Sequence, residues 1–122
     1  MPTTLKTDAA TATATIEVDG RVTKEDFDRL VPEFEAFIDA LGTVRLIEII
    51  HNLEGFDAGV VWKGFKLDMK VIPHISHCAV VGDIGWMSPV AKAAGAVIST
   101  KLRTFSMDEL DAAKAWIADP DA

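Results

Sequence analysis

Three histidines and one cysteine are the residues in this sequence best suited to hold a metal ion. His74, His77 and Cys78 lie close together, and His51 or Asp83 is available as a further ligand. Imidazole and thiolate are ligands that zinc favours in proteins. Neighbouring residues on a strand point to opposite faces, however, so His77 and Cys78 are expected to diverge. We therefore predict structural or surface histidines, with no metal and no cofactor.

Asp83 is the acidic residue best placed to bind a ligand. It follows a short apolar run that predicts a strand, and α/β sheets bind ligands at the carboxyl ends of their strands. Together with Trp86 and Met87 it would line a pocket. The alternative is an aspartate that closes a turn and caps a short helix, with both large apolar side chains in the core or in an interface.

No combination of residues indicates an enzyme. The chain has no Gly-x-Ser-x-Gly motif, no glycine-rich phosphate loop with its lysine, and no cysteine–histidine pair in a plausible setting. Glu25 and Asp26 are adjacent carboxylates, but they stand at a predicted helix start, where the helix dipole favours acidic residues. We therefore expect a protein without catalytic activity.

The composition indicates one globular domain that spans residues 1–122. The chain has 122 residues, of which 49% are hydrophobic, and this size is typical of a single domain. Its formal net charge of −7 argues against binding to nucleic acid, which depends on clustered lysine and arginine. No apolar run approaches the roughly 20 residues of a membrane span. A single cysteine and the lack of a signal-peptide pattern favour the cytoplasm.

Helix and strand patterns alternate along the chain. The clearest helix begins after Thr23, which can cap it, and ends at Gly42, with apolar residues at every third or fourth position. Val44–Ile50 is almost continuously apolar, as expected of a strand covered on both faces. The other predicted elements are a strand at Thr11–Val18, a turn at Asp19-Gly20, a helix from about Asp57 to Ile72, a strand at His77–Val81, a short helix at Trp86–Ala94, a strand at Ser99–Phe105, and a final helix that opens with a capping box of Ser106 and Glu109.

This order of elements predicts an α/β fold. Strands that alternate with helices form a mainly parallel sheet with crossover helices. Residues 1–10 form either a weak first strand, paired with the next strand as a hairpin, or a flexible end. We predict a four- to five-stranded mixed, mainly parallel sheet with about four helices.

Several stretches of the sequence resemble the SpoIIAA-like family of the STAS superfamily. They are GRVTKEDFDRLVPEFEAFI, VRLIEIIHNLEGFDAGVVWKGFKLDMK, HCAVVGDIGW and LRTFSMDELDAAKAWI, and they occur in the order in which that family has them. The resemblance implies a STAS-like fold, which is related in architecture to CRAL-TRIO lipid-exchange domains. It implies no particular reaction, because this branch of the superfamily consists mostly of proteins of unknown function.

The predicted loop between the central strand and the second helix departs from the STAS pattern. Anti-anti-sigma STAS proteins carry a phosphorylated Ser or Thr in this loop, where the amides of a helix N-terminus hold the phosphate. Here the loop, residues 51–59, contains no Ser, Thr or Tyr, so the phosphorylation switch is not carried over. Asp57 stands near the position of the phosphoserine. It is either a permanent anionic substitute or, more simply, the N-cap of the second helix.

Two surfaces are candidates for contact with a partner. Residues 84–91 and 93–98 form an apolar run that a small domain is poorly able to bury, and this run predicts a homodimer. Lys63, Lys66 and Lys70 form a stripe on one side of the second helix. The stripe is either a solvated face or a docking site for an acidic partner or a lipid head group.

Two functions follow from these observations. The first is a non-enzymatic regulatory module that binds a protein partner through the second helix and the loop before it. The second is a carrier or sensor of a small apolar or lipid-like ligand, held in a cavity behind the second helix. Val61, Trp62, Phe65 and Trp86 would line that cavity.

Overall fold

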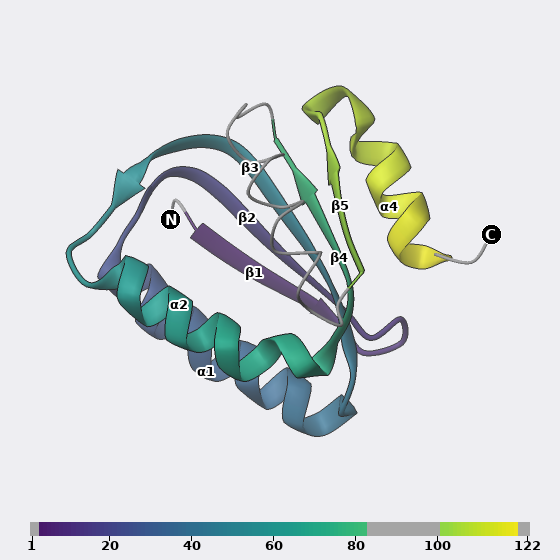
Figure 1. Ribbon diagram of the computed structural model, residues 1–122, viewed down its shortest axis with the longest axis horizontal. Helices are drawn as coiled ribbons and strands as arrows, with labels where there is room; N and C mark the ends of the chain where they lie inside the picture. The colour runs from purple at the N-terminus through teal and green to yellow at the C-terminus, as the bar shows by residue number, and fades with distance from the viewer. Residues whose placement is uncertain (1–2, 83–100, 120–122) are drawn as a thin grey trace.

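The computed structural model of the protein describes residues 3–82 and 101–119, apart from the side chains of residues 61, 62, 65, 68 and 69. Within this part, five strands form one sheet in the order β1-β2-β3-β4-β5 (Figure 1). Neighbouring strands run parallel to one another, except for the antiparallel pair β1–β2. The strands are β1 (Thr3–Asp8), β2 (Thr13–Val22), β3 (Val44–Phe56), β4 (Ile75–Val81) and β5 (Lys101–Phe105). The predicted mixed, mainly parallel sheet is confirmed, and its first strand pairs as a hairpin.

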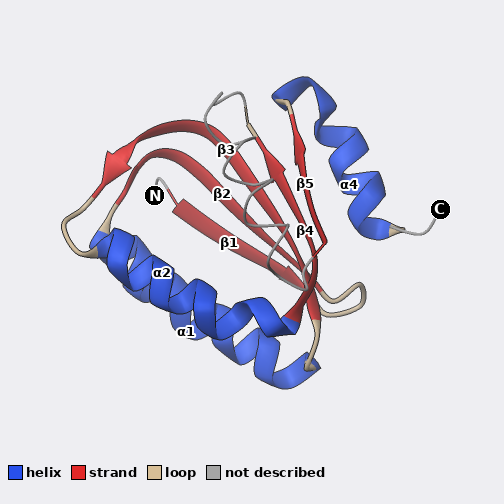
Figure 2. Ribbon diagram, viewed as in Figure 1, coloured by secondary structure: helices blue, strands red, loops and turns tan. Residues whose placement is uncertain are grey.

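Helices cover both faces of this sheet. α1 (Lys24–Leu41) and α2 (Val60–Val71) lie side by side on one face, and α4 (Leu110–Ala118) lies on the other (Figure 2). A 3-10 turn, η1 (Ile72–His74), connects α2 to β4, and a second, η2 (Met107–Glu109), leads into α4. The helix predicted at Trp86–Ala94 lies outside the described residues.

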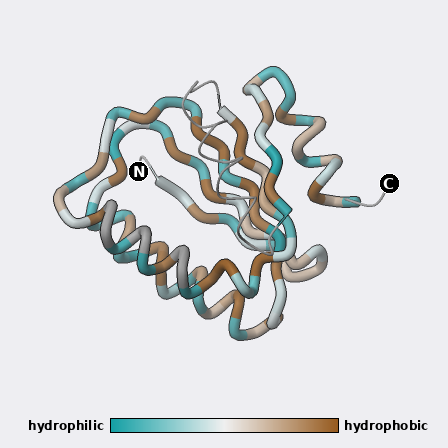
Figure 3. The backbone as a smooth tube through the Cα atoms, in the orientation of Figure 1, coloured by the Kyte–Doolittle hydropathy of each residue, from teal (hydrophilic) through white to brown (hydrophobic). Residues whose placement is uncertain are grey.

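Two main apolar clusters, one on each face of the sheet, hold the three layers together. Hydrophobic and hydrophilic residues alternate along parts of the strands, as the colours of the backbone show (Figure 3). Successive residues of a strand point to opposite faces, so β3 supplies Leu46 to one cluster and Ile47 to the other. The prediction that this strand is covered on both faces is therefore confirmed. The cluster beneath α1 and α2 consists of Ala14, Leu30, Phe34, Ile38, Val44, Leu46, Val71, Ile75, Cys78 and Val80. The cluster beneath α4 consists of Ile47, Ile49, Ala79, Val81, Phe105, Ala113 and Ile117.

The ends of α1 lie where the sequence places them. The hydroxyl of Thr23 accepts a hydrogen bond from the backbone N–H of Asp26 at 3.1 Å, which is the expected N-cap contact. At the other end the N–H of Gly42 donates to the carbonyl oxygen of Ile38 at 2.7 Å. Gly42 has a φ of +82°, a conformation that glycine adopts more readily than other residues. The helix continues through Pro32, which lies within it.

β3 is longer than predicted, and this is the main correction to the sequence-based fold. It continues past Ile50 to Phe56, so that only residues 57–59 remain between it and α2, which begins at Val60. Four of these added residues, 52, 53, 55 and 56, pair with the end of β2, and all of residues 51–56 are exposed or half-buried. This extension lies beyond the buried, apolar part of the strand, and the sequence there looks like a loop for that reason.

The predicted turn at Asp19-Gly20 is also wrong, because both residues lie inside β2. The pairing of β2 with β3 shifts register between Val18 and Asp19 and again between Gly20 and Arg21. Gly20 has a φ of +120°, which a glycine tolerates at such an irregularity. The Asp-Gly pair therefore marks a bulged strand rather than a chain reversal.

Candidate functional site

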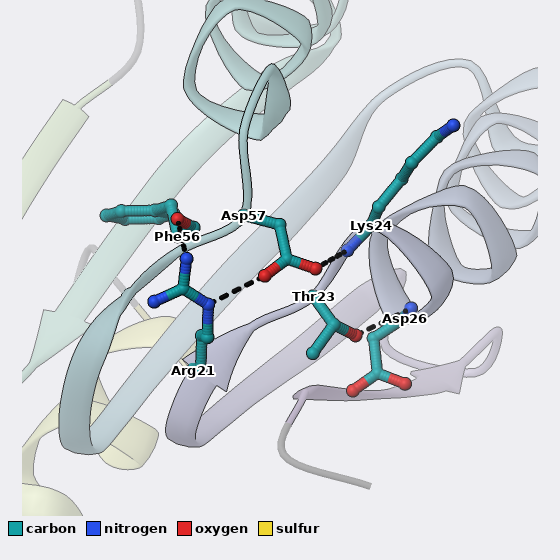
Figure 4. A network of polar contacts seen from close by, with 6 residues as sticks. All are labelled: Arg21, Thr23, Lys24, Asp26, Phe56 and Asp57. Carbon is teal, nitrogen blue, oxygen red and sulfur yellow. Dashed lines mark hydrogen bonds and ion pairs between the residues drawn. The ribbon is translucent and has the colours of Figure 1, made fainter.

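A network of polar contacts ties the C-terminal ends of β2 and β3 to the start of α1 and to the residues before α2 (Figure 4). Because β2 and β3 are parallel, Arg21 lies in register with Gly55, and Asp57 follows two residues later. Pairing of the strands thus brings together side chains that are 36 residues apart in sequence. We call Arg21, Lys24, Phe56 and Asp57 the clamp.

Both carboxylate oxygens of Asp57 accept hydrogen bonds within the clamp. Oδ1 accepts one from Nε of Arg21 at 2.6 Å, and Oδ2 accepts one from the backbone N–H of Lys24 at 2.9 Å. The Arg21 guanidinium and then the Lys24 amide lower the pKa of Asp57 below its ordinary value of 3.8, because both stabilise the charged form. Asp57 is therefore an anion at neutral pH.

The prediction that Asp57 provides the side-chain cap of α2 is wrong. Its carboxylate binds the N–H of Lys24, the first residue of α1, while its carbonyl oxygen accepts from the N–H of Val60, the first residue of α2, at 3.1 Å. The amides in the first turn of a helix lack partners within the helix, so an acceptor from elsewhere in the chain stabilises them. Asp57 thus contacts the starts of both helices.

Arg21 also holds the backbone just before Asp57. Its terminal nitrogen donates to the carbonyl oxygen of Phe56 at 2.7 Å. Gly55 has a φ of +134°, and a Cβ atom there would lie 3.3 Å from the Arg21 guanidinium. A side chain at position 55 would therefore strain the backbone and press on the arginine. The end of β3 is fixed by Arg21 from one side.

Phe56 is exposed beside this fixed backbone. It is 42% exposed, and among the described residues the only other exposed large hydrophobic residue is Leu41, at the far end of α1. Figure 4 shows the Phe56 carbonyl turned toward Arg21, with the ring directed away from Asp57. The ring is thus presented on the surface by a backbone that the clamp holds in place.

A second polar group lies under the start of α1. Asp26 is 5% exposed and accepts a hydrogen bond from the backbone N–H of Thr3 at 3.1 Å. Its other oxygen lies 3.0 Å from Arg29, which in turn donates to the carbonyl oxygen of Thr3 at 3.3 Å. These contacts tie β1 to α1. Asp26 is therefore a structural residue that holds β1 against α1. Its neighbour in sequence, Glu25, is exposed.

The other predicted site residues fall outside the described structure, either as whole residues or in their side chains. Asp83, Trp86 and Met87 lie outside the described residues, as do the side chains of Val61, Trp62 and Phe65, although positions 61, 62 and 65 belong to α2, which follows the clamp.

The histidines predicted to be structural or surface residues have separate surroundings. The ring of His77 packs edge-on against Trp116, with 5.6 Å between ring centroids, whereas His51 pairs with Glu17 at 3.0 Å. His74 is exposed and contacts the carbonyl oxygen of Gly42. In the part of the chain that the structure describes, no group of three or more His, Cys, Asp or Glu residues is arranged to hold a metal ion.

Two lysines of the predicted stripe face acidic residues of α1. Lys63 lies 3.6 Å from Asp28, and Lys70 lies 3.2 Å from Glu35. The exposed fractions of the four side chains range from 32% to 68%, so each ion pair contributes little to stability. The stripe is in part a link between α2 and α1.

Arg21 is the site residue that sequence reasoning missed. In the sequence it is an ordinary charged residue between the predicted turn at Asp19-Gly20 and the helix N-cap at Thr23. Only the parallel register of β2 with β3 reveals its partner, and that register is a property of the sheet. The available signal is the pair of glycines at positions 20 and 55, which mark irregular backbone on both strands.

The structure is an α/β domain with a mixed sheet between helices, and the carboxylate of Asp57 lies at the strand end before α2. The SpoIIAA-like family model matches residues 13–118, so the chain belongs to the SpoIIAA-like family. No curated protein matches the chain in sequence.

A solved structure supports the same fold. It is the crystal structure, at 2.25 Å resolution, of an uncharacterized protein of the DUF3478 family with a SpoIIAA-like fold from Shewanella loihica PV-4. The two chains are 17% identical and superpose with a TM-score of 0.74, over 94% of this chain and 91% of the other. In this chain, no helix of the described part is long and apolar enough to cross a membrane.

Proposed function

We propose that this protein is a non-enzymatic interaction module, which binds a protein partner through Phe56, the residues before α2 and the exposed side of α2. The observation that carries the proposal is the exposed Phe56 ring on a backbone held by Arg21 and Asp57. Aromatic residues on rigid supports are typical anchors of protein interfaces, because little conformational entropy is lost when they bind.

The chemistry of the clamp supports binding rather than catalysis. Nε and one terminal nitrogen of Arg21 donate to neighbouring groups, and both oxygens of Asp57 accept hydrogen bonds. A general acid or base needs a pKa near the working pH, whereas the pKa of Asp57 is lowered. The charged groups of the clamp thus serve to hold the backbone.

The resemblance to STAS proteins adds a regulatory aspect to this proposal. Anti-anti-sigma members carry a phosphorylated Ser or Thr in the loop before the second helix, and a phosphate adds negative charge there. Residues 51–59 contain no hydroxyl group that could accept a phosphate, and Asp57 supplies a permanent negative charge there instead. We therefore expect the surface around Phe56 to remain in one state, without phosphorylation of this segment.

Site-specific photo-crosslinking in the native host cell tests the proposal. A photoreactive phenylalanine analogue replaces Phe56 in one strain and Leu41, which is 37% exposed at the other end of α1, in a matched control strain. We expect one protein to be captured from position 56 and not from position 41. Equal capture from both positions, or none from position 56, would contradict the proposed surface.

Self-association and apolar ligands remain further proposals. The homodimer predicted from the apolar run at residues 84–98 rests on residues outside the described ones, and so does the carrier hypothesis with its cavity behind α2. Native mass spectrometry tests both at once. A mass of two chains supports the dimer, and an added mass of a few hundred daltons that is lost on denaturation supports the carrier.

A further inference from the structure

α4 packs against only part of its face of the sheet. Among the described strands, its main contacts are with β3, β4 and β5, and α1 packs on β1 and β2 from the other face. Lys6, Thr15 and Ile47 lie side by side on three adjacent strands, as the register shows. This row of three residues therefore begins with polar side chains on β1 and β2 and ends with Ile47, which belongs to the apolar cluster beneath α4.

An open cleft lies where the sheet passes from this polar part to α4. It has a volume of about 240 Å³ and includes Lys6, Thr13 and Thr15 from β1 and β2, Ile47 from β3, and Lys114 and Ile117 from α4. Ile47 and Ile117 are almost fully buried and form its apolar base. A cleft of this size accommodates a small molecule that displaces about eight waters.

The cleft is positively charged in a protein that is negatively charged overall. Neither Lys6 nor Lys114 has an acidic partner within 4.0 Å in the described part of the chain, whereas Lys63 and Lys70 on the opposite face both do. Asp8 is the single acidic residue of the lining, and one of its oxygens accepts a hydrogen bond from the N–H of Ala10 at 3.0 Å. Two lysines against one aspartate leave the lining cationic, while the whole chain carries −7.

The end of α4 does not cancel this charge. The C-terminal end of a helix carries a partial negative charge, which would repel an anion in the cleft. Here Arg45 donates to the carbonyl oxygens of Ile117 and Ala118 at 2.6 Å and 3.0 Å. The guanidinium thus neutralises the helix end next to the cleft.

We propose that this cleft binds a small organic phosphate monoester. Such a group carries a charge of about −1.5 to −2 at pH 7 and has three strong acceptor oxygens. Lys6 and Lys114 supply the two positive charges, from the sheet and from the helix, and the half-buried Thr15 adds a hydroxyl group to the lining. The organic part of the ester lies above the apolar base of the cleft, which Ile47 and Ile117 fill from below.

The site is separate from the clamp. Thr15 lies near the start of β2, and Arg21 lies six residues further along the same strand. At about 3.3 Å per residue, the two sites are roughly 20 Å apart. A test of the phosphate site is therefore independent of the test of the proposed partner surface.

Nuclear magnetic resonance on the ¹⁵N-labelled full chain tests the proposal, with phenyl phosphate as the probe. We expect saturable shifts of the amide signals of residues 13–15 and 117–118. Replacement of both lysines (Lys6→Gln with Lys114→Gln) is expected to weaken binding at least tenfold. The control variant, Lys63→Gln with Lys70→Gln, changes the net charge equally on the other face, and its dissociation constant is expected to stay within twofold of wild type.

Three outcomes would overturn the site. Phenyl phosphate produces no saturable shift at residues 13–15 of the wild-type protein, or it shifts signals near lysines on both faces alike. The third is that the control variant loses as much affinity as the cleft variant, which would show a response to net charge alone. Both double variants replace exposed lysines only, and the amide spectrum of each variant shows whether the fold is retained.

Discussion

Phe34 and Phe56 offer a matched pair of substitutions, because the same change is made in the core and at the proposed surface. Phe34 is 2% exposed and lies in the cluster between α1 and the sheet, whereas Phe56 is 42% exposed. Truncation of a buried phenylalanine to alanine costs about 3–5 kcal/mol, because contacts are lost and a cavity forms. At Phe56 much of the ring is already in water, so we expect Phe56→Ala to cost about 1 kcal/mol or less.

The difference is large enough to read from melting temperatures. For a domain of 122 residues, an unfolding entropy of about 2.1 cal/mol/K per residue converts 1 kcal/mol into about 4 °C. Phe34→Ala should therefore lower Tm by about 12–20 °C, and Phe56→Ala by about 4 °C or less. Thermal unfolding followed by circular dichroism at one pH and one protein concentration measures both.

Two results would contradict these expected changes in Tm. If Phe56→Ala lowers Tm as much as Phe34→Ala does, the Phe56 ring is part of the core and is not available to a partner. If Phe34→Ala has as little effect as Phe56→Ala, the cluster between α1 and the sheet is not the core described above.

Substitutions at three further residues test the contacts that hold the site and the layers. Asp57→Asn should destabilise the protein most at neutral pH. The folded-state pKa of Asp57 lies below 3.8, so the stabilisation from its charged form is present above pH 3.8 and is lost as the pH falls through the folded-state pKa. The difference in Tm between wild type and Asp57→Asn should therefore narrow in acid, and a difference that widens would contradict the clamp. Thr23→Ala removes the N-cap of α1 and should cost about 1 kcal/mol, whereas Thr23→Ser should restore it; equal melting of all three proteins would rule out the cap. Ile117→Ala should lower the free energy of unfolding by about 2–5 kcal/mol, because Ile117 is the residue of α4 that is 1% exposed and packs against the sheet. A change in Tm below about 2 °C would show that α4 is not anchored at this residue.

The sequence was a good guide to the parts of the fold that local patterns determine. The cap at Thr23, the end of α1 at Gly42 and the capping box of Ser106 and Glu109 are formed as expected. Each depends on residues a few positions apart, so the pattern and the contact coincide. The apolar segment Val44–Ile50 also predicts correctly a strand that is buried on both faces.

Features that depend on contacts between distant segments could not be predicted. The extension of β3 to Phe56 relies on pairing with β2, and its own residues lack the apolar signature of a buried strand. Asp57 was identified from its position, but its partners lie 33 and 36 residues away. Arg21 carries no local signal for its role, because the register of two parallel strands creates that role.

Calorimetry with the protein captured at position 56 measures directly how much Phe56 contributes to partner binding, when three forms of this chain are titrated with it. Wild type is compared with Phe56→Ala and with Leu41→Ala, which removes the other exposed large hydrophobic side chain of the described structure. We expect binding to be about tenfold weaker or more for Phe56→Ala and unchanged for Leu41→Ala. Equal affinity of all three proteins would contradict a partner surface centred on Phe56.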